Sequence, residues 1–212
     1  PTIADFDGDG VMEIASAGGY SYNVFEFVRH PEPKIELKWS VPTRDLSSNV
    51  TGSSVFDFEG DGRAEVVYAD ECFVRVYDGT HGLVPASAPE AKPLFEVPSS
   101  SGTIHEYPVL VDVNADNRTE FLVVANARNK NCNAIYGAMD PVPEYRSGIF
   151  VYGDANNRWV RTRRIWNQHS YHQTNIENDG RVPSPEPQSF SPGRNNDYRV
   201  SSQGKGVYNA PD

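Results

Sequence analysis

The sequence predicts an all-β protein made of about three repeated, four-stranded antiparallel sheets, followed by an irregular C-terminal tail. A nine-residue acidic motif returns about every 50 residues, beginning at residues 5, 57 and 112. Between the copies, short runs rich in Val, Ile, Phe and Tyr alternate with turn residues, and the chain holds 17 Gly and 16 Pro. Many short strands joined by tight turns have this composition.

The repeated motif has an oxygen-bearing side chain at positions 1, 3, 5 and 9 in each copy. We call residues 5–13 loop 1, residues 57–65 loop 2 and residues 112–120 loop 3. In a tightly curled loop, alternate side chains turn inward and the carbonyl of position 7 adds a further oxygen, as a calcium ion requires. One such copy could be an ordinary acidic turn. Three copies in register favour three calcium loops.

The predicted ligands follow directly from these positions. They are Asp5, Asp7, Asp9, the Val11 carbonyl and Glu13 in loop 1; Asp57, Glu59, Asp61, the Arg63 carbonyl and Glu65 in loop 2; and Asp112, Asn114, Asp116, the Arg118 carbonyl and Glu120 in loop 3. Position 6 is Gly or Asn, the residue types that best tolerate a positive φ. Loop 3 departs most from the pattern, because an amide replaces one carboxylate and Ala115 replaces a glycine.

Four strands can be assigned to each repeat from the apolar runs and the turn residues between them. We predict strands at 2–5, 13–16, 22–28 and 34–40, then at 54–58, 65–69, 73–77 and 93–97, and then at 109–113, 120–125, 148–152 and 158–165. Each acidic loop then joins the first two strands of its repeat as a hairpin. A repeat of this length with four strands is typical of a β-propeller blade.

The array resembles the FG-GAP/VCBS-type repeats, the calcium-bearing blades also seen in the propeller of integrin α chains. The resemblance covers residues 1–166, with blades at about 1–52, 53–107 and 108–166. It implies calcium at the blade edges, held by the loop residues named above. Residues 159–172 also resemble a segment found near the end of such arrays in large bacterial surface or secreted proteins.

Three blades cannot close a ring, because propellers usually have four to eight. The chain starts at a repeat boundary, four residues before the first aspartate of loop 1. We therefore expect a fragment or a processed product. The remaining blades would come from another polypeptide or from residues absent from this sequence.

The net charge of −10 has a local origin, because the three loops together hold eleven carboxylates. This distribution indicates metal-site acidity, and it argues against nucleic acid as a partner. Two carboxylates ~4 Å apart repel by about 4 kcal/mol at an effective dielectric constant near 20, so calcium should contribute to folding. No apolar run approaches the roughly 20 residues that span a membrane.

The two cysteines, Cys72 and Cys132, each lie shortly after the second predicted strand of a repeat. They could form a disulfide or remain as two buried thiols. A bridge would close a loop of about 60 residues and contribute roughly 4 kcal/mol. Calcium loops and a disulfide would both favour an extracellular setting.

Residues 167–212 are rich in Asn, Gln, Ser, Pro and Gly, and we expect them to wrap over the blades or to lead to another domain. Just before them, Arg158, Arg161, Arg163 and Arg164 form a basic cluster. This cluster could bind an acidic polysaccharide, but an outer blade strand with alternating exposed Arg is the favoured interpretation.

A second group, Arg164, His169, Tyr171 and His172, could carry acid–base chemistry, as in a polysaccharide lyase built on a calcium propeller. A metal bound by His169 and His172 would lack an obvious third ligand. The favoured function is therefore non-catalytic: a calcium-stabilised propeller segment of a secreted or surface protein, used for binding, adhesion or assembly. Its ligand would be a surface protein or a polysaccharide. The alternative is an extracellular carbohydrate-active enzyme.

Overall fold

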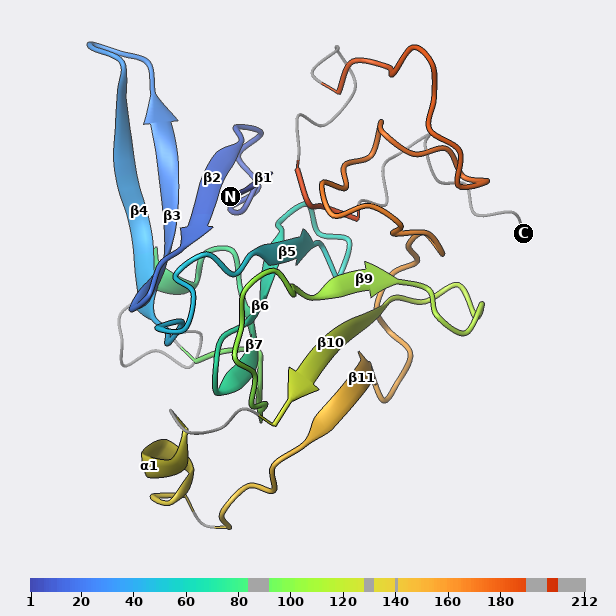
Figure 1. Cartoon of the computed structure of the whole chain (residues 1–212). Coiled ribbons are helices and arrows are strands. Elements are labelled where there is room, and N and C mark those ends of the chain that lie inside the picture. The colour runs from blue at the N-terminus through green and yellow to red at the C-terminus, as the bar shows by residue number, and fades with distance from the viewer. Residues whose placement is uncertain (84–91, 128–131, 140, 190–197, 202–212) are drawn as a thin grey trace.

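A computed structural model describes residues 1–83, 92–127, 132–139, 141–189 and 198–201. These residues form an almost entirely β structure (Figure 1). The strands are β1 Thr2–Ala4, β2 Glu13–Ala17, β3 Ser21–Val28, β4 Lys34–Pro42, β5 Ser53–Phe56, β6 Glu65–Ala69, β7 Phe73–Tyr77, β8 Phe95–Pro98, β9 Val109–Val111, β10 Glu120–Asn126 and β11 Ser147–Gly153. The described helices are the 3-10 turn η1 His81–Leu83 and the four-residue α1 Asn133–Tyr136.

The strands form three antiparallel sheets in which each strand pairs with its neighbour in sequence. Sheet A has the order β1-β2-β3-β4, sheet B has the order β5-β6-β7-β8, and sheet C has the order β11-β10-β9. Each predicted acidic loop joins the first two strands of its sheet, as a hairpin. The all-β class and the antiparallel hairpins are therefore confirmed. The described residues form an open stack of sheets and do not form a closed ring.

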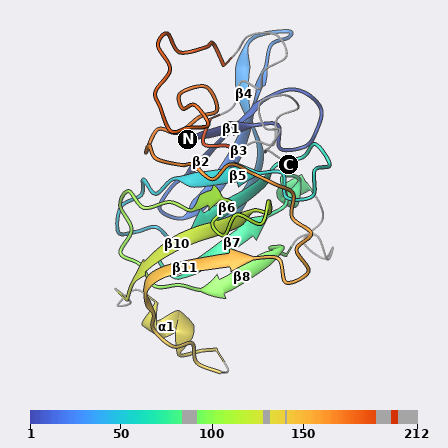
Figure 2. The same ribbon diagram turned by 90° about the vertical axis from the view of Figure 1, so that its right-hand side faces the viewer.

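The sheets pack face to face, with sheet B in the middle, and each interface has its own apolar core. Between sheets A and B the core is aromatic and aliphatic, with Tyr22 and Trp39 packed against Val66 and Tyr68. Between sheets B and C, Phe58 and Phe121 pack with Leu110. The first strands β1, β5 and β9 follow one another across the stack (Figures 1 and 2).

Neighbouring sheets are also joined by hydrogen bonds. The Ala64 N–H in loop 2 donates to the Asp5 carbonyl in loop 1 over 3.1 Å, and the Trp39 Nε1–H of sheet A donates to the Gly79 carbonyl over 2.7 Å. Gly79 has no room for a side chain, because a Cβ there would lie 1.9 Å from the Phe6 carbonyl oxygen. Loops 1 and 2 are thus held directly against each other.

The predicted fourth strand of the third repeat, at 158–165, is wrong. These residues form no strand, and β11 remains the edge of sheet C. Instead the Val160 N–H donates to the Phe58 carbonyl over 3.0 Å, and the Arg163 carbonyl accepts the Asp112 N–H over 2.9 Å. The segment therefore leaves the edge of β11 and lies between loops 2 and 3, with Trp159 packed on Phe58.

The described part of the tail covers the outer edges of the first strands of sheets A and B. Tyr198 forms an antiparallel bridge with Ile3, and Val200 forms a parallel bridge with Val55. The Arg199 N–H donates to the Tyr171 carbonyl over 3.1 Å, which links the two described parts of the tail. The sequence of residues 195–200 also predicts a short closing strand, of which positions 195–197 lie outside the described residues.

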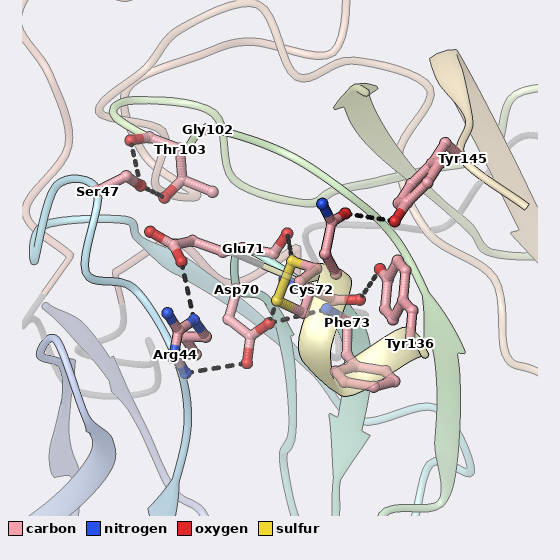
Figure 3. The surroundings of a disulfide bond; sticks show 12 residues. Arg44, Ser47, Asp70, Glu71, Cys72, Phe73, Gly102, Thr103, Tyr136 and Tyr145 are labelled. Carbon is pink, nitrogen blue, oxygen red and sulfur yellow. Dashed lines mark hydrogen bonds and ion pairs between the residues drawn. A yellow bond between two sulfur atoms is a disulfide. The ribbon is translucent and has the colours of Figure 1, made fainter. Parts of the chain in front are cut away.

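Cys72 and Cys132 form a disulfide, so the paired alternative holds and the buried-thiol alternative does not. The bond joins the turn after β6 to the start of α1, across a sequence separation of 60 residues. Around it, Tyr136 packs on Phe73 and donates a hydrogen bond from its hydroxyl to the Cys72 carbonyl (Figure 3). The segment between β10 and β11 is thereby attached to sheet B.

Replacing both cysteines by serine should lower the free energy of unfolding by about 4 kcal/mol, because the unfolded chain regains the freedom that a cross-link over 60 residues removes. Urea unfolding of the oxidised protein and of the double variant measures this difference. Wild-type protein kept in reductant is the control and should match the variant. A difference below about 1 kcal/mol would contradict the stabilising role.

Candidate metal centre

The three acidic loops share one backbone hydrogen-bond scheme, which the first aspartate organises. In loop 1, Asp5 Oδ1 accepts the N–H groups of Gly8 and Asp9 over 2.8 and 3.1 Å, and Asp5 Oδ2 accepts the N–H of Gly10 over 2.9 Å. Asp57 in loop 2 and Asp112 in loop 3 accept the N–H groups of positions 4, 5 and 6 in the same way. One carboxylate therefore closes each loop from within.

Positions 4 and 6 of every loop have a positive φ. In loops 1 and 2 both positions are glycine, with φ between 76° and 91°. In loop 3 they are Ala115 and Asn117, with φ of 67° and 64°. Because an alanine rarely adopts this conformation, loop 3 follows the same path at a higher conformational cost.

The glutamate at position 9 is a buried carboxylate in each loop. Glu13 Oε2 accepts the Phe6 N–H over 2.8 Å, and Glu65 and Glu120 accept the N–H of position 2 in their own loops over 2.9 and 2.8 Å. Burial raises the pKa of all three carboxyls, and the other loop carboxylates raise it further. A buried, repelled carboxylate of this kind favours either a proton or a cation beside it.

Loop 1 already has a cation next to its carboxylates. Lys38 Nζ on β4 lies 2.6 Å from Asp7 Oδ2 and 3.4 Å from Glu13 Oε1. Among the described residues, Asp5, Asp7 and Glu13 are the group whose ligand atoms all lie within 4.8 Å of one another. The most compact acidic cluster is thus also the one that an ammonium group contacts.

Loop 2 has four carboxylates, and within the described parts of the chain no ion pair involves its Glu59, Asp61 or Glu65. Burial and the charges of Glu59, Asp57 and Asp61 raise the pKa of Glu65 to about 9, although the Phe58 N–H opposes this shift. Its carboxylate and carbonyl oxygens are donor types that calcium takes in proteins.

In loop 3 an amide takes part in the charge balance. Asn114 Oδ1 accepts the Asp116 N–H over 2.9 Å, whereas Asn114 Nδ2 donates to Asp116 Oδ2 and Glu120 Oε1 over 3.1 and 3.4 Å. Asn157 Nδ2 donates to Asp116 Oδ2 as well, over 3.2 Å. Loop 3 therefore offers calcium fewer negative oxygens than loop 2 does.

The candidate acid–base residues of the tail have separate surroundings. Tyr171 is fully buried, stacks on Trp166, and accepts a hydrogen bond from Arg163, not from Arg164, over 3.1 Å. His172 Nε2 lies 2.5 Å from Glu186 Oε1. The exposed His169 packs edge-on against the rings of His105 and Tyr107. His169 and His172 therefore contact different neighbours.

The four arginines of the basic cluster also have different surroundings. Arg163 is 5% exposed and donates to the Ile176 carbonyl and to Asn178 Oδ1 over 2.7 and 3.1 Å. Arg158 pairs with Asp154, while Arg161 and Arg164 are exposed. The expected alternation on an outer blade strand is wrong, because the segment is irregular and its one buried guanidinium anchors the tail.

The sequence interpretation did not identify Lys38, which lies 25 residues beyond Glu13. The pairing of β3 with β4 brings it there, through a register shift between Val24 and Phe25. An isolated lysine in an exposed hairpin carries no sequence signal of this role.

The fold and its loops define a class: an all-β chain of stacked antiparallel sheets with a repeated acidic loop in each sheet. Its sequence matches no protein-family model and no curated protein. Among solved structures it is similar to the V. cholerae biofilm matrix protein Bap1, with a TM-score of 0.70 and 28% identity. The match covers 90% of this chain and 27% of that chain, so the chain spans about a quarter of that protein.

The raised pKa of Glu65 predicts a pH-dependent stability in the absence of metal. The folded protein holds this proton with a pKa of about 9 and the unfolded chain with one of 4.5, so the stabilisation is complete below pH 4.5 and is lost as the pH rises towards 9. In chelator, the melting temperature should therefore fall from about pH 5 to about pH 9.

Glu65→Gln should reduce this fall, because an amide does not titrate. Thermal melts in chelator at several pH values measure the effect, and Glu32→Gln at an exposed position is the matched control. An unchanged pH profile in Glu65→Gln would contradict the assignment.

Proposed function

We propose that this chain is a calcium-stabilised β-propeller segment that acts in an extracellular matrix by binding or adhesion, without catalysis. The observation that carries the proposal is the likeness to a biofilm matrix protein over 90% of the chain at 28% identity. The disulfide supports an extracellular setting, because such bonds persist in oxidising environments. Neither described helix has the length and apolar character to cross a membrane.

The propeller assignment is supported by the outer faces of the stack. Sheets A and B, and sheets B and C, already pack in the same face-to-face manner. On sheet A, the face away from sheet B has exposed Phe27, Ile35 and Leu37 on the β3–β4 hairpin, which projects beyond the sheet in Figure 1. These side chains are suited to packing against a further sheet.

Sheet C has the same property on its face away from sheet B. Val124, Ile149 and Val151 alternate along β10 and β11 with core residues, and they are 48%, 69% and 49% exposed. Continuation of the stack on both sides by further blades would cover these faces. Those blades would belong to another polypeptide or to further residues of a longer chain.

Calcium would be held by the odd-numbered side chains of a loop and by the carbonyl of its position 7. The donors are carboxylate, amide and carbonyl oxygens, the ligand types that calcium takes in proteins. When bound, the ion neutralises the loop charge and stabilises the hairpin. Since the Asp5 carbonyl accepts the Ala64 N–H of the next loop, ordering one loop also orders the contact between sheets.

Binding without catalysis is favoured by the tail contacts. Tyr171 is enclosed, and its hydroxyl is held by the Arg163 guanidinium. The His172 imidazole is engaged by Glu186 and lies beside the ring of Tyr198. These side chains therefore do not place an acid and a base around a common substrate site.

Calcium should raise the melting temperature of the metal-stripped chain. At 100 times its dissociation constant, one ion adds about 2.7 kcal/mol, which is roughly 5–10 °C for a chain of this size. Asp61→Asn in loop 2 should remove most of this increase, because it removes one of the four carboxylates of that loop. Asp179→Asn, at an exposed aspartate of the tail, is the control. An equal calcium effect in Asp61→Asn and wild type would contradict loop 2 as the main site.

The binding function is tested with anionic and neutral polysaccharides, by co-sedimentation of the chain and by product analysis of the same samples. We expect retention on a polysaccharide in calcium, weaker retention in chelator, and no cleavage product. Product formation that His172→Ala abolishes would overturn the non-catalytic assignment. Absence of retention on every polysaccharide would leave adhesion to proteins, which pull-down on immobilised matrix proteins measures separately.

A further inference from the structure

Lys38 differs from the other lysine of β4 in its surroundings. Its side chain is 12% exposed, and its ammonium group contacts Asp7 over 2.6 Å, Glu13 over 3.4 Å and Glu26 over 3.6 Å. The exposed Lys34, by contrast, pairs with the exposed Glu36 on the same strand. Three carboxylates, two from loop 1 and one from β3, therefore converge on one partly buried ammonium.

In the part of the chain that the structure describes, the other two sheets have no lysine at the equivalent place. In sheet A, Val24 pairs with Trp39, and Lys38 precedes that tryptophan. In sheet B, Val76 pairs with Phe95, and the residue before it is Leu94, which is 56% exposed. In sheet C no fourth strand is formed by the described residues. At this position of the repeat, the described residues therefore place a lysine in sheet A and an exposed leucine in sheet B.

The position of Lys38 conflicts with a calcium ion in loop 1. The ammonium lies against position 3 and position 9 of the loop, two of the side chains that would hold the ion. Two cations cannot share these oxygens without strong repulsion, since unit charges 4 Å apart interact by about 4 kcal/mol at an effective dielectric constant near 20. A calcium ion would have to displace Lys38 and leave its ammonium without these partners.

We propose that Lys38 is a built-in counter-ion of loop 1, so that loop 1 is closed by an internal ammonium and calcium is bound by loops 2 and 3. This inference rests on the proposed calcium-stabilised function and assigns the ions to loops within it. Lys38 thereby determines which loops calcium occupies, because its charge makes loop 1 unavailable to the ion. Loop 1 keeps its shape at any calcium concentration, whereas loop 2 responds to calcium.

The test counts the bound ions by isothermal titration calorimetry of the metal-stripped full chain. In the wild-type background, Asp9→Asn in loop 1 should leave the number of bound calcium ions unchanged, and Asp61→Asn in loop 2 should lower it by one. Lys38→Leu, which copies the Leu94 of sheet B, should add one site. Asp9→Asn in the Lys38→Leu background should remove that added site again.

Lys34→Leu is the matched control, because it removes the same charge from the same strand and should add no site. In chelator, Lys38→Leu should lower the melting temperature, since Glu13 stays buried without its partner, and calcium should restore it. Loss of one ion by Asp9→Asn in the wild-type background would overturn the proposal, and so would an unchanged count in a folded Lys38→Leu. If Lys38→Leu does not fold, the Asp9→Asn count decides. Absence of calcium binding by every variant would instead overturn the proposed function.

Discussion

The structure depends on the hydrogen bonds that the first aspartate of each acidic loop accepts from the backbone. Its carboxylate accepts three backbone N–H groups within six residues, in loop 1 as in loops 2 and 3. A carboxylate that satisfies three such donors stabilises a tight turn that would otherwise leave them without partners. The turn sets the register of the hairpin, and the register sets which side chains face the next sheet.

One backbone scheme therefore supports three electrostatic solutions. In loop 1 an ammonium from a neighbouring strand balances the charge, and in loop 3 two amides donate to it. In loop 2 burial and the neighbouring carboxylates raise the pKa of Glu65 strongly. The first aspartate thus closes all three loops in the same way, whereas the charges around the loops differ. In the function we propose, the sheet stack stays stable while only some of its loops respond to calcium.

Much of the fold could be predicted from the sequence, because its signals are local. The loops have fixed spacing, and strands such as β6 and β7 have the bounds that their apolar runs indicate. The segment at 158–165 could not be assigned in this way. Its alternating Arg, Val, Thr and Ile fit a strand, but packing of Trp159 on Phe58 is a tertiary contact that overrides the pattern.

The candidate site, too, could be predicted only in part from the sequence. The loop carboxylates were predictable from their spacing, but the position of Lys38 depends on a one-residue shift in the pairing of β3 with β4. Without that shift, every following side chain of β4 would face the other side of the sheet. The role of Arg163 as a buried anchor likewise depends on where the tail folds back, which no local pattern encodes.

The central claim is that these loops are divalent-cation sites whose occupancy is set by the charges around them. X-ray diffraction from crystals grown in calcium, with anomalous differences, tests it most directly. The account predicts an ion in loop 2, with oxygen ligands at about 2.3–2.6 Å from Asp57, Asp61 and the Arg63 carbonyl, and Lys38 still in contact with Asp7. A well-ordered loop 2 without an ion at millimolar calcium would contradict it.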